Sequence, residues 1–180
     1  AANRLGVFSF LTKNEATVKE IADGLSCKER GIKSLLDALV GCGYVLESNG
    51  KYEMSPQARK SLTPDSPHSV NNFLELNYLN WEWLGDLEKA IRTGMSLDMH
   101  HSELLDPEGW RRYIYGLHDL SKMAAKEVVL RFRLKPTQKL LLDIGGGHGV
   151  YAAEYCRKYP FLKSMIFDLP PSVEVGKEIV

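Results

Sequence analysis

The residues best suited to chemistry lie in one glycine-rich stretch, Lys139–Gly149, which reads KLLLDIGGGHG. A short apolar run that carries one acid, Asp143, precedes four glycines that only His148 interrupts. Such a run is typical of a buried parallel strand, and the next segment, Val150–Tyr159, is rich in helix-forming residues. Glycines between a strand and a helix let a ligand approach the main chain closely, and the helix start offers free N–H groups. The stretch therefore predicts a turn that binds a nucleotide-like ligand.

The spacing of the glycines excludes two common nucleotide-binding turns. The dinucleotide fingerprint G-x-G-x-x-G fails from Gly145, because its last position falls on Val150. The chain also lacks the G-K-[ST] ending of a P-loop. The pattern that does occur is D-x-G-x-G-x-G, formed by Asp143, Gly145, Gly147 and Gly149.

A second acid follows at the distance expected for a carboxylate that binds ribose. The segment KSMIF, residues Lys163–Phe167, predicts the next strand, and Asp168 stands at its carboxyl end. Asp168 comes 19 residues after Gly149, close to the roughly 20 that separate the glycine turn from the ribose-binding acid in dinucleotide folds. A carboxylate suits a ribose diol because its two oxygens can accept from both hydroxyl groups.

Together with the FDLP sequence that ends at Pro170, these motifs resemble those of the S-adenosylmethionine-dependent O-methyltransferases of the caffeic acid and hydroxyindole type. The resemblance implies methyl transfer from S-adenosylmethionine to a hydroxyl of a small aromatic acceptor, although family members also methylate nitrogen or carbon. It implies no metal. It implies that Trp83 and Tyr115 line the acceptor pocket and that the cofactor is bound by Asp143, Gly145, Gly146, Gly147, Gly149, Asp168, Leu169 and, near the sulfonium, Met123.

The resemblance also implies a catalytic base that has no counterpart in this chain. In the family the base is a histidine further along a larger sheet, whereas this sequence predicts two strands before Val180, too few to close a core. His118 is better explained by packing than as a base. We therefore expect an N-terminal part of a longer protein, without turnover on its own; otherwise the missing strands come from another copy.

Composition and charge narrow the choice of partners and compartment. The 180 residues include 23 basic and 23 acidic side chains, and this balance gives no long-range attraction to nucleic acid or anionic lipid. No apolar run approaches the roughly 20 residues of a membrane span. Three irregularly spaced cysteines favour free thiols in a reducing, cytoplasmic compartment. The His100-His101 pair is not expected to bind a metal, because it lacks a third ligand.

The N-terminal third predicts helices followed by a hairpin, which is a winged-helix plan. Ala1–Thr12 suits one short helix, and Thr17–Glu20 and Ser26–Glu29 each fit a capping box that opens a further helix. Asn49-Gly50 between two apolar segments predicts a type I′ turn. The resemblance implies that this domain forms a homodimer.

A winged helix also leaves open a second function, a transcriptional regulator with a ligand-sensing α/β domain. Lys28, Arg30 and Lys33 lie near the start of the third helix, where a helix that reads the major groove would need them. Glu29 lies among them, however, and the hairpin adds only Lys51. This charge pattern favours a small-molecule acceptor over DNA as the partner.

The rest of the chain predicts mainly helices before the glycine turn. Ser55-Pro56 opens a short helix, Val70–Asn80 and Trp81–Thr93 suit two more, and Asp106-Pro107 opens a long one over Glu108–Arg133. The expected buried stripe of the long helix is Trp110, Ile114, Leu117, Ser121, Ala124, Val128 and Phe132.

The predicted fold class is α/β with an N-terminal, mostly helical winged-helix domain and a Rossmann-like domain that is only begun. We divide the chain into a winged-helix dimerisation domain over residues 1–66, a helical linker that lines the acceptor pocket over 67–134, and the start of a cofactor-binding domain over 135–180.

Overall fold

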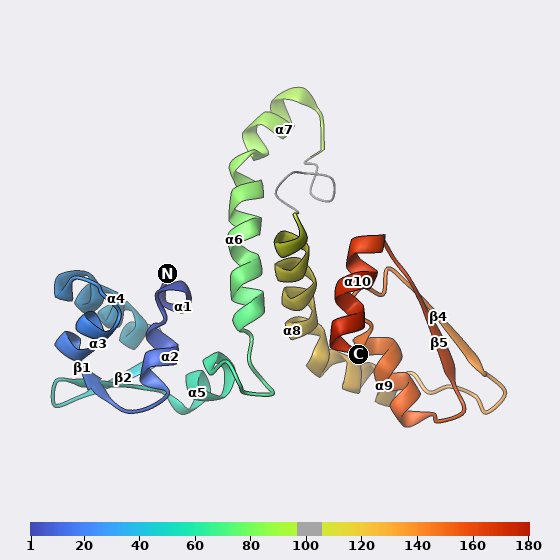
Figure 1. Cartoon of the computed structure of the whole chain (residues 1–180), viewed down its shortest axis with the longest axis horizontal. Coiled ribbons are helices and arrows are strands. Elements are labelled where there is room, and N and C mark those ends of the chain that lie inside the picture. Colours follow the sequence, from blue (N-terminus) through green and yellow to red (C-terminus); the bar gives the residue numbers. More distant parts are fainter. Residues whose placement is uncertain (97–105) are drawn as a thin grey trace. The chain divides into compact units, whose positions relative to one another are not determined.

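The computed structural model describes residues 1–96 and 106–180, apart from the side chain of Glu82. The fold is mixed α/β, and the chain divides into two compact units, residues 1–71 and 72–180 (Figure 1). The predicted His100-His101 pair lies outside the described residues. Within the described ranges, no helix is both long and apolar enough to cross a lipid bilayer.

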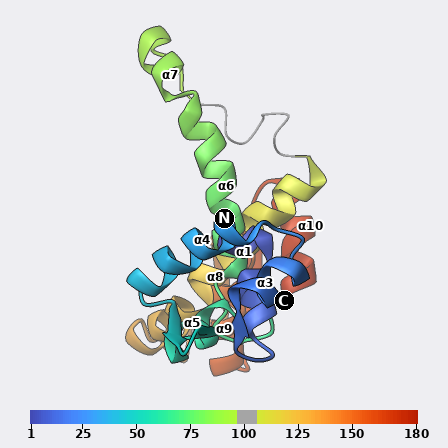
Figure 2. The same ribbon diagram turned by 90° about the vertical axis from the view of Figure 1, so that its left-hand side faces the viewer.

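The first unit combines short helices with a small antiparallel sheet. Its sheet has the strand order β1-β3-β2. Helix α3 packs against α4, and both are labelled in Figure 2. The fully buried side chains of Leu11, Ile21, Ile32, Leu36 and Met54 form its centre. Its elements are α1 (Ala2–Leu5), α2 (Val7–Leu11), β1 (Ala16–Thr17), α3 (Val18–Gly24), α4 (Glu29–Gly41), β2 (Val45–Ser48), β3 (Lys51–Met54) and α5 (Pro56–Leu62).

Two local predictions in the first unit are confirmed. Asn49 and Gly50 have φ values of 51° and 77°, as a type I′ turn requires. Thr17 forms the predicted capping box, because its hydroxyl accepts from the Glu20 N–H at 3.3 Å while the Glu20 carboxylate accepts from the Thr17 N–H at 2.7 Å.

The second predicted capping box, Ser26–Glu29, is wrong. Helix α4 begins at Glu29 after Lys28 and has no side-chain cap. Ser26 instead has a left-handed φ of 52° and ends α3, because its N–H donates to Asp23 O and the Cys27 N–H donates to Ala22 O. This paired arrangement is a Schellman motif, which competes with an N-cap for the same residue.

Substitutions at Thr17 and Ser26 should therefore differ in their effect on the free energy of unfolding. We expect Thr17→Ala to lower the free energy of unfolding by about 1 kcal/mol, because the Glu20 N–H at the start of α3 loses its hydroxyl acceptor. Ser26→Ala should change it by less than about 0.5 kcal/mol, as a surface substitution does. Urea denaturation measures both, and an equal loss from both variants would show that Ser26 does cap a helix.

Two further expectations for the first unit need correction. The predicted single helix Ala1–Thr12 is divided at Gly6, whose φ of 79° separates α1 from α2. Strand β1, which was not predicted, pairs with β3 through Ala16 and Tyr52. At two residues, β1 is too short to show a period in the sequence.

The second unit places helices beside a two-stranded parallel sheet. Strands β4 and β5 pair from Leu140↔Lys163 to Ile144↔Phe167, and α9 makes the crossover between them. A core of Leu76, Leu79, Trp83, Trp110, Ile114 and Val175 joins α6, α8 and α10. The elements are α6 (Asn71–Gly85), α7 (Leu87–Thr93), α8 (Pro107–Arg131), β4 (Leu140–Ile144), α9 (Val150–Lys158), β5 (Lys163–Phe167) and α10 (Pro170–Ile179).

Two predictions for the second unit are corrected by these bounds and by burial. The helix break predicted after Asn80 lies at Asp86 instead, since Trp83 continues the buried face of α6. In the second half of α8 the buried residues are Ala125 and Val129, whereas Ala124, Val128 and Phe132 were expected. Helix α9 packs against this half of α8 and sets the face that is buried.

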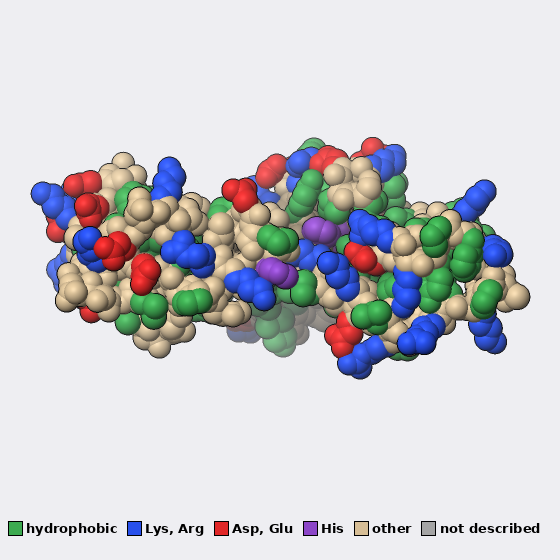
Figure 3. All heavy atoms as spheres, turned by 90° about the horizontal axis from the view of Figure 1, so that it is seen from below, with side chains coloured by type: hydrophobic (Ala, Val, Ile, Leu, Met, Phe, Trp, Pro, Cys, Tyr) green, Lys and Arg blue, Asp and Glu red, His purple; other side chains and the backbone are tan. Residues whose placement is uncertain are grey.

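The strand expected to be buried is largely exposed. Along β4 the residues alternate between exposed and half-buried, with Leu140 at 60% and Ile144 at 74% exposure. The same alternation runs along β5, where Phe167 is 69% exposed. Among the described residues β4 pairs with β5 alone, so one face of the pair remains apolar and open, and hydrophobic side chains are visible at the surface in Figure 3.

Candidate ligand-binding site

The glycine turn connects β4 to α9 and is fixed at both ends by main-chain hydrogen bonds. The Gly145 N–H donates to Phe167 O at 2.8 Å, and the Gly149 N–H donates to Gly146 O at 2.8 Å. Gly145, Gly147 and Gly149 have φ values of 72°, 43° and 70°, which side chains other than glycine rarely adopt. These glycines therefore allow the backbone conformation of the turn and also leave its main chain accessible to a ligand.

At two further positions, neighbouring atoms lie so close to the main chain that only glycine fits. A Cβ added at Gly146 would lie 2.7 Å from Asp143 Cγ. A Cβ added at Gly176, in the middle of α10, would lie 2.3 Å from the carbonyl oxygen of Gly147. Gly176 was not predicted for the site, because a single glycine within a helix carries no signal of what packs against it.

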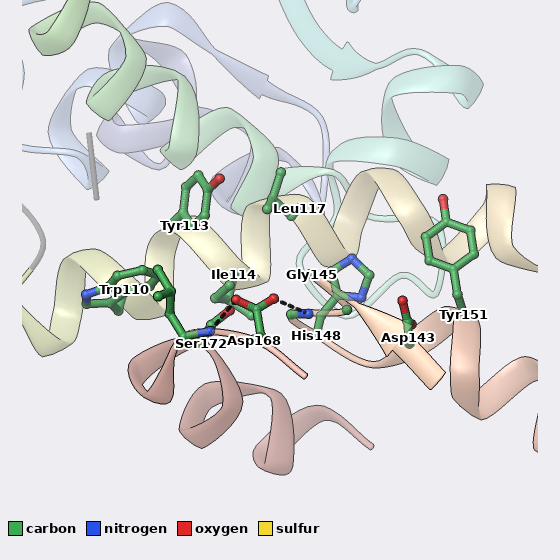
Figure 4. Close-up of a pocket in the computed structure, with 13 residues that line it drawn as sticks. Trp110, Tyr113, Ile114, Leu117, Asp143, Gly145, His148, Tyr151, Asp168 and Ser172 are labelled. Atoms are coloured by element: carbon green, nitrogen blue, oxygen red, sulfur yellow. Dashed lines mark hydrogen bonds between the residues drawn. The ribbon is translucent and has the colours of Figure 1, made fainter. Parts of the chain in front are cut away.

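A cavity of about 470 Å³ opens beside the turn (Figure 4). Its walls come from α8, the glycine turn, the carboxyl end of β5 and the start of α10, all within the second unit. It is lined by Trp110, Tyr113, Ile114, Leu117, Asp143, Gly145, Gly146, Gly147, His148, Tyr151, Asp168, Leu169 and Ser172.

Asp168 anchors the turn from the end of β5. Its Oδ2 accepts from the Gly147 N–H at 2.7 Å, and its Oδ1 accepts from the Leu169 N–H at 2.6 Å (Figure 4). A carboxylate has about four acceptor sites, so both oxygens can still accept from a ligand in the cavity. Asp168 thus holds the turn and faces the cavity at once.

Asp143 presents a buried acceptor without a donor. Its Oδ2 is buried and has no hydrogen-bond partner among the described residues. Burial, and secondarily the negative charge of Asp168, raises the pKa of Asp143. A buried carboxylate of this kind is stabilised by a ligand that brings a donor or a positive charge.

The cavity brings together most of the residues predicted to bind a cofactor, namely Asp143, Gly145, Gly146, Gly147, Asp168 and Leu169. Gly149 is the N-cap of α9 and does not line it. Met123 is 53% exposed on α8 and is not among the lining residues. Trp83 is buried in the core beside Trp110, and Tyr115 donates to Glu178 at 3.3 Å; neither lines the cavity.

Several lining residues were not predicted for the site. Trp110, Ile114 and Leu117 were predicted only for the buried stripe of the long helix, and Tyr113 was not predicted at all. His148 was noted only as an interruption of the glycines, and Tyr151 follows in the first turn of α9. The position of these two residues in or next to the glycine turn could have indicated that they line the site. No local sequence feature marks Ser172 as a lining residue.

Two family models match the sequence and together cover most of it. The model of the O-methyltransferase domain matches residues 87–180. The model of the O-methyltransferase dimerisation domain matches residues 1–64.

Individual relatives agree with these matches. A probable bifunctional dTTP/UTP pyrophosphatase/methyltransferase protein of Homo sapiens is 30% identical over 97% of this chain and 30% of its own length. The 3-hydroxy-5-methyl-1-naphthoate 3-O-methyltransferase of Streptomyces sahachiroi is 28% identical over 94% of this chain and 50% of its own length. The crystal structure of human N-acetylserotonin methyltransferase in complex with SAM matches with a TM-score of 0.82 and 26% identity, over 98% of this chain and 56% of that one. The chain thus spans about half, or less, of the length of these relatives.

Proposed function

The chain belongs to the O-methyltransferase family, whose domain matches residues 87–180, and from this premise we propose that the protein transfers a methyl group from S-adenosylmethionine to a hydroxyl of a small aromatic acceptor. The cavity beside the glycine turn is the donor site in this proposal. Both family models support this function over the DNA-binding regulator. Lys and Arg side chains are also scattered among other types on the face seen in Figure 3.

The observation that carries the proposal is the pair of carboxylates at the turn. S-adenosylmethionine bears a sulfonium and an ammonium, and when bound it supplies an electrophilic methyl group. The Oδ2 of Asp143, which has no partner within residues 1–96 and 106–180, and the neighbouring Asp168 fit a cation-bearing, donor-rich ligand. A Cβ at Gly147 would meet Ser172, Asp168 and Ile114 within 3.6 Å, so the missing side chain keeps the cavity open.

Each wall of the cavity has a role in this proposal. Asp168 accepts from the ribose hydroxyls, Asp143 compensates positive charge, and Gly145 and Gly147 allow the main chain to approach the donor. The aromatic side chains of α8, with Trp110 and Tyr113 foremost, exclude water from the reacting atoms. Exclusion of water and a fixed donor are what an in-line methyl transfer requires.

For the first unit we propose a winged-helix dimerisation domain. The match to the dimerisation domain over residues 1–64 supports a second copy as the partner. The three-stranded sheet and the β2–β3 hairpin support the winged-helix assignment. The division into residues 1–66, 67–134 and 135–180 belongs to the same proposal, as does a cytoplasmic location, which three free cysteines support.

Donor binding tests the proposed function. S-adenosylhomocysteine titrated into the purified full-length protein should bind and release heat. We expect Asp168→Ala to weaken this binding by about 10- to 100-fold, since hydrogen bonds to a charged group contribute about 1.5–3 kcal/mol each. Isothermal titration calorimetry gives the dissociation constants.

The control is Glu174→Gln, which removes an exposed carboxylate that pairs only with Lys177 among the described residues. This variant should bind S-adenosylhomocysteine as the unaltered protein does. No binding by the unaltered protein, or equal binding by Asp168→Ala, would contradict the proposal.

A further inference from the structure

His148 is the one residue of the turn 145–149 with a side chain, and that side chain is buried. Its Nδ1 accepts from the Val150 N–H at 3.2 Å, and its Nε2 lies 3.1 Å from the Ser121 hydroxyl oxygen on α8. An N–H can only donate, so Nδ1 carries no proton. The neutral ring therefore holds its proton on Nε2 and donates it to Ser121.

The surroundings of His148 keep the ring neutral. Burial first, and then the charge of His118 on α8, lowers the pKa of His148 to about 4, against the opposing effect of Asp168 at the end of β5. The two imidazole rings lie 5.9 Å apart edge to face. Burial also lowers the pKa of His118, with Asp119 opposing this shift and Lys122 adding to it. At neutral pH both rings are uncharged, and the bond to Ser121 is retained.

We propose that His148 is a positioning residue that holds the glycine turn against α8 through Ser121. The next residue back, Gly147, is already held by Asp168 on its N–H and lies against Gly176 on its carbonyl. The bond from His148 adds a third constraint, and it comes from the helix that supplies Trp110 and Tyr113 to the same cavity.

This inference rests on the proposed function, because it assigns His148 the task of keeping the donor cavity in shape. The turn and α8 both line that cavity, and the hydrogen bond from His148 to Ser121 joins them directly. A shift of the turn would move Gly147 and Asp168 away from the positions that fit the donor.

Four variants separate positioning from mere packing. Ser121→Ala removes the acceptor, and Ser121→Thr restores it. His148→Asn keeps an acceptor near the Val150 N–H but is too short to reach Ser121, whereas His148→Gln places an amide donor near the position of Nε2. We expect Ser121→Ala and His148→Asn to weaken S-adenosylhomocysteine binding about tenfold, and Ser121→Thr and His148→Gln to remain within about threefold of the unaltered protein.

Imidazole ¹⁵N NMR of the full-length protein supplies a readout that does not depend on the ligand. The signal of His148 should be that of the neutral ring with its proton on Nε2, and it should stay so from pH 8 to about pH 5. Because the native pKa lies below the 6.5 of an unperturbed histidine, the free energy of unfolding should fall as pH falls from 6.5 towards 4. His148→Gln should reduce that slope.

The outcomes distinguish the inference from the proposed function. If the unaltered protein binds S-adenosylhomocysteine and Ser121→Ala and His148→Asn bind it equally well, the positioning role is wrong and the proposed function stands. A proton on Nδ1 of His148 would also overturn the role. If the unaltered protein does not bind S-adenosylhomocysteine at all, the proposed function fails and the role of His148 fails with it.

Discussion

Replacement of Gly176 by alanine should weaken S-adenosylhomocysteine binding at least tenfold and lower the free energy of unfolding by about 2 kcal/mol. The new Cβ would lie 2.3 Å from the carbonyl oxygen of Gly147. That oxygen belongs to the main chain and cannot rotate away, so either α10 or the turn must move. A movement of Gly147 carries with it the N–H that Asp168 accepts at 2.7 Å. Calorimetry and urea denaturation measure the two effects on one sample.

Gly31→Ala on α4 is the matched control for this substitution. A Cβ at Gly31 would meet nothing within 4 Å, and an alanine within a helix is favoured over glycine by about 0.5–1 kcal/mol. This variant should be slightly more stable and should bind the ligand normally. If Gly176→Ala also binds normally, the contact between α10 and the turn does not shape the cavity.

Asp119→Ala should lower the free energy of unfolding by about 3 kcal/mol, through loss of a cap and of a buried charge interaction. Asp119 is buried on α8, and its Oδ2 accepts from the N–H groups of Asn72 at 2.8 Å and Phe73 at 3.3 Å. These two N–H groups belong to the first turn of α6, where no partner within the helix exists. Its Oδ1 lies 3.0 Å from Lys122 Nζ. One carboxylate therefore ties the start of α6 to α8.

Two comparisons test this assignment by urea denaturation. Asp119→Asn keeps an oxygen acceptor for the start of α6 but loses the charge, so its loss of stability should be about half as large. Asp37→Ala removes an exposed acid that pairs with Lys33, and exposed pairs contribute about 0.2–1 kcal/mol. A loss from Asp119→Ala no greater than that from Asp37→Ala would show that Asp119 does not hold α6.

The features that the sequence predicted correctly depend on neighbours within a few residues. Ser55 caps α5 by accepting from the Ala58 N–H, and Asp106 caps α8 by accepting from the Gly109 N–H at 2.7 Å. The turn at Asn49 belongs to the same class, since its φ follows from local chemistry. Gly145, Gly146 and Gly147 were predictable as cavity residues for this reason as well.

The features that escaped prediction depend on segments that meet only in the folded unit. The bond from His148 to Ser121 spans 27 residues, and the contact of Gly176 with Gly147 joins α10 to the turn. The buried face of α8 includes Ala125 and not the predicted Ala124 for the same reason, because the packing of α9 against α8 determines which face is covered. Periodicity gives the kind of element and approximate face, whereas the exact partner of each side chain is a tertiary property.

Every second residue along β4 and β5 is exposed, and this has a practical consequence for work with this chain in isolation. Each strand of the pair has one edge without a hydrogen-bonded neighbour among the described residues, next to apolar side chains such as Leu142 and Met165. An uncovered edge of this kind recruits strands from other molecules. Preparations of residues 1–180 should therefore self-associate as their concentration rises, and charged substitutions at Leu142 or Met165 should improve their solubility.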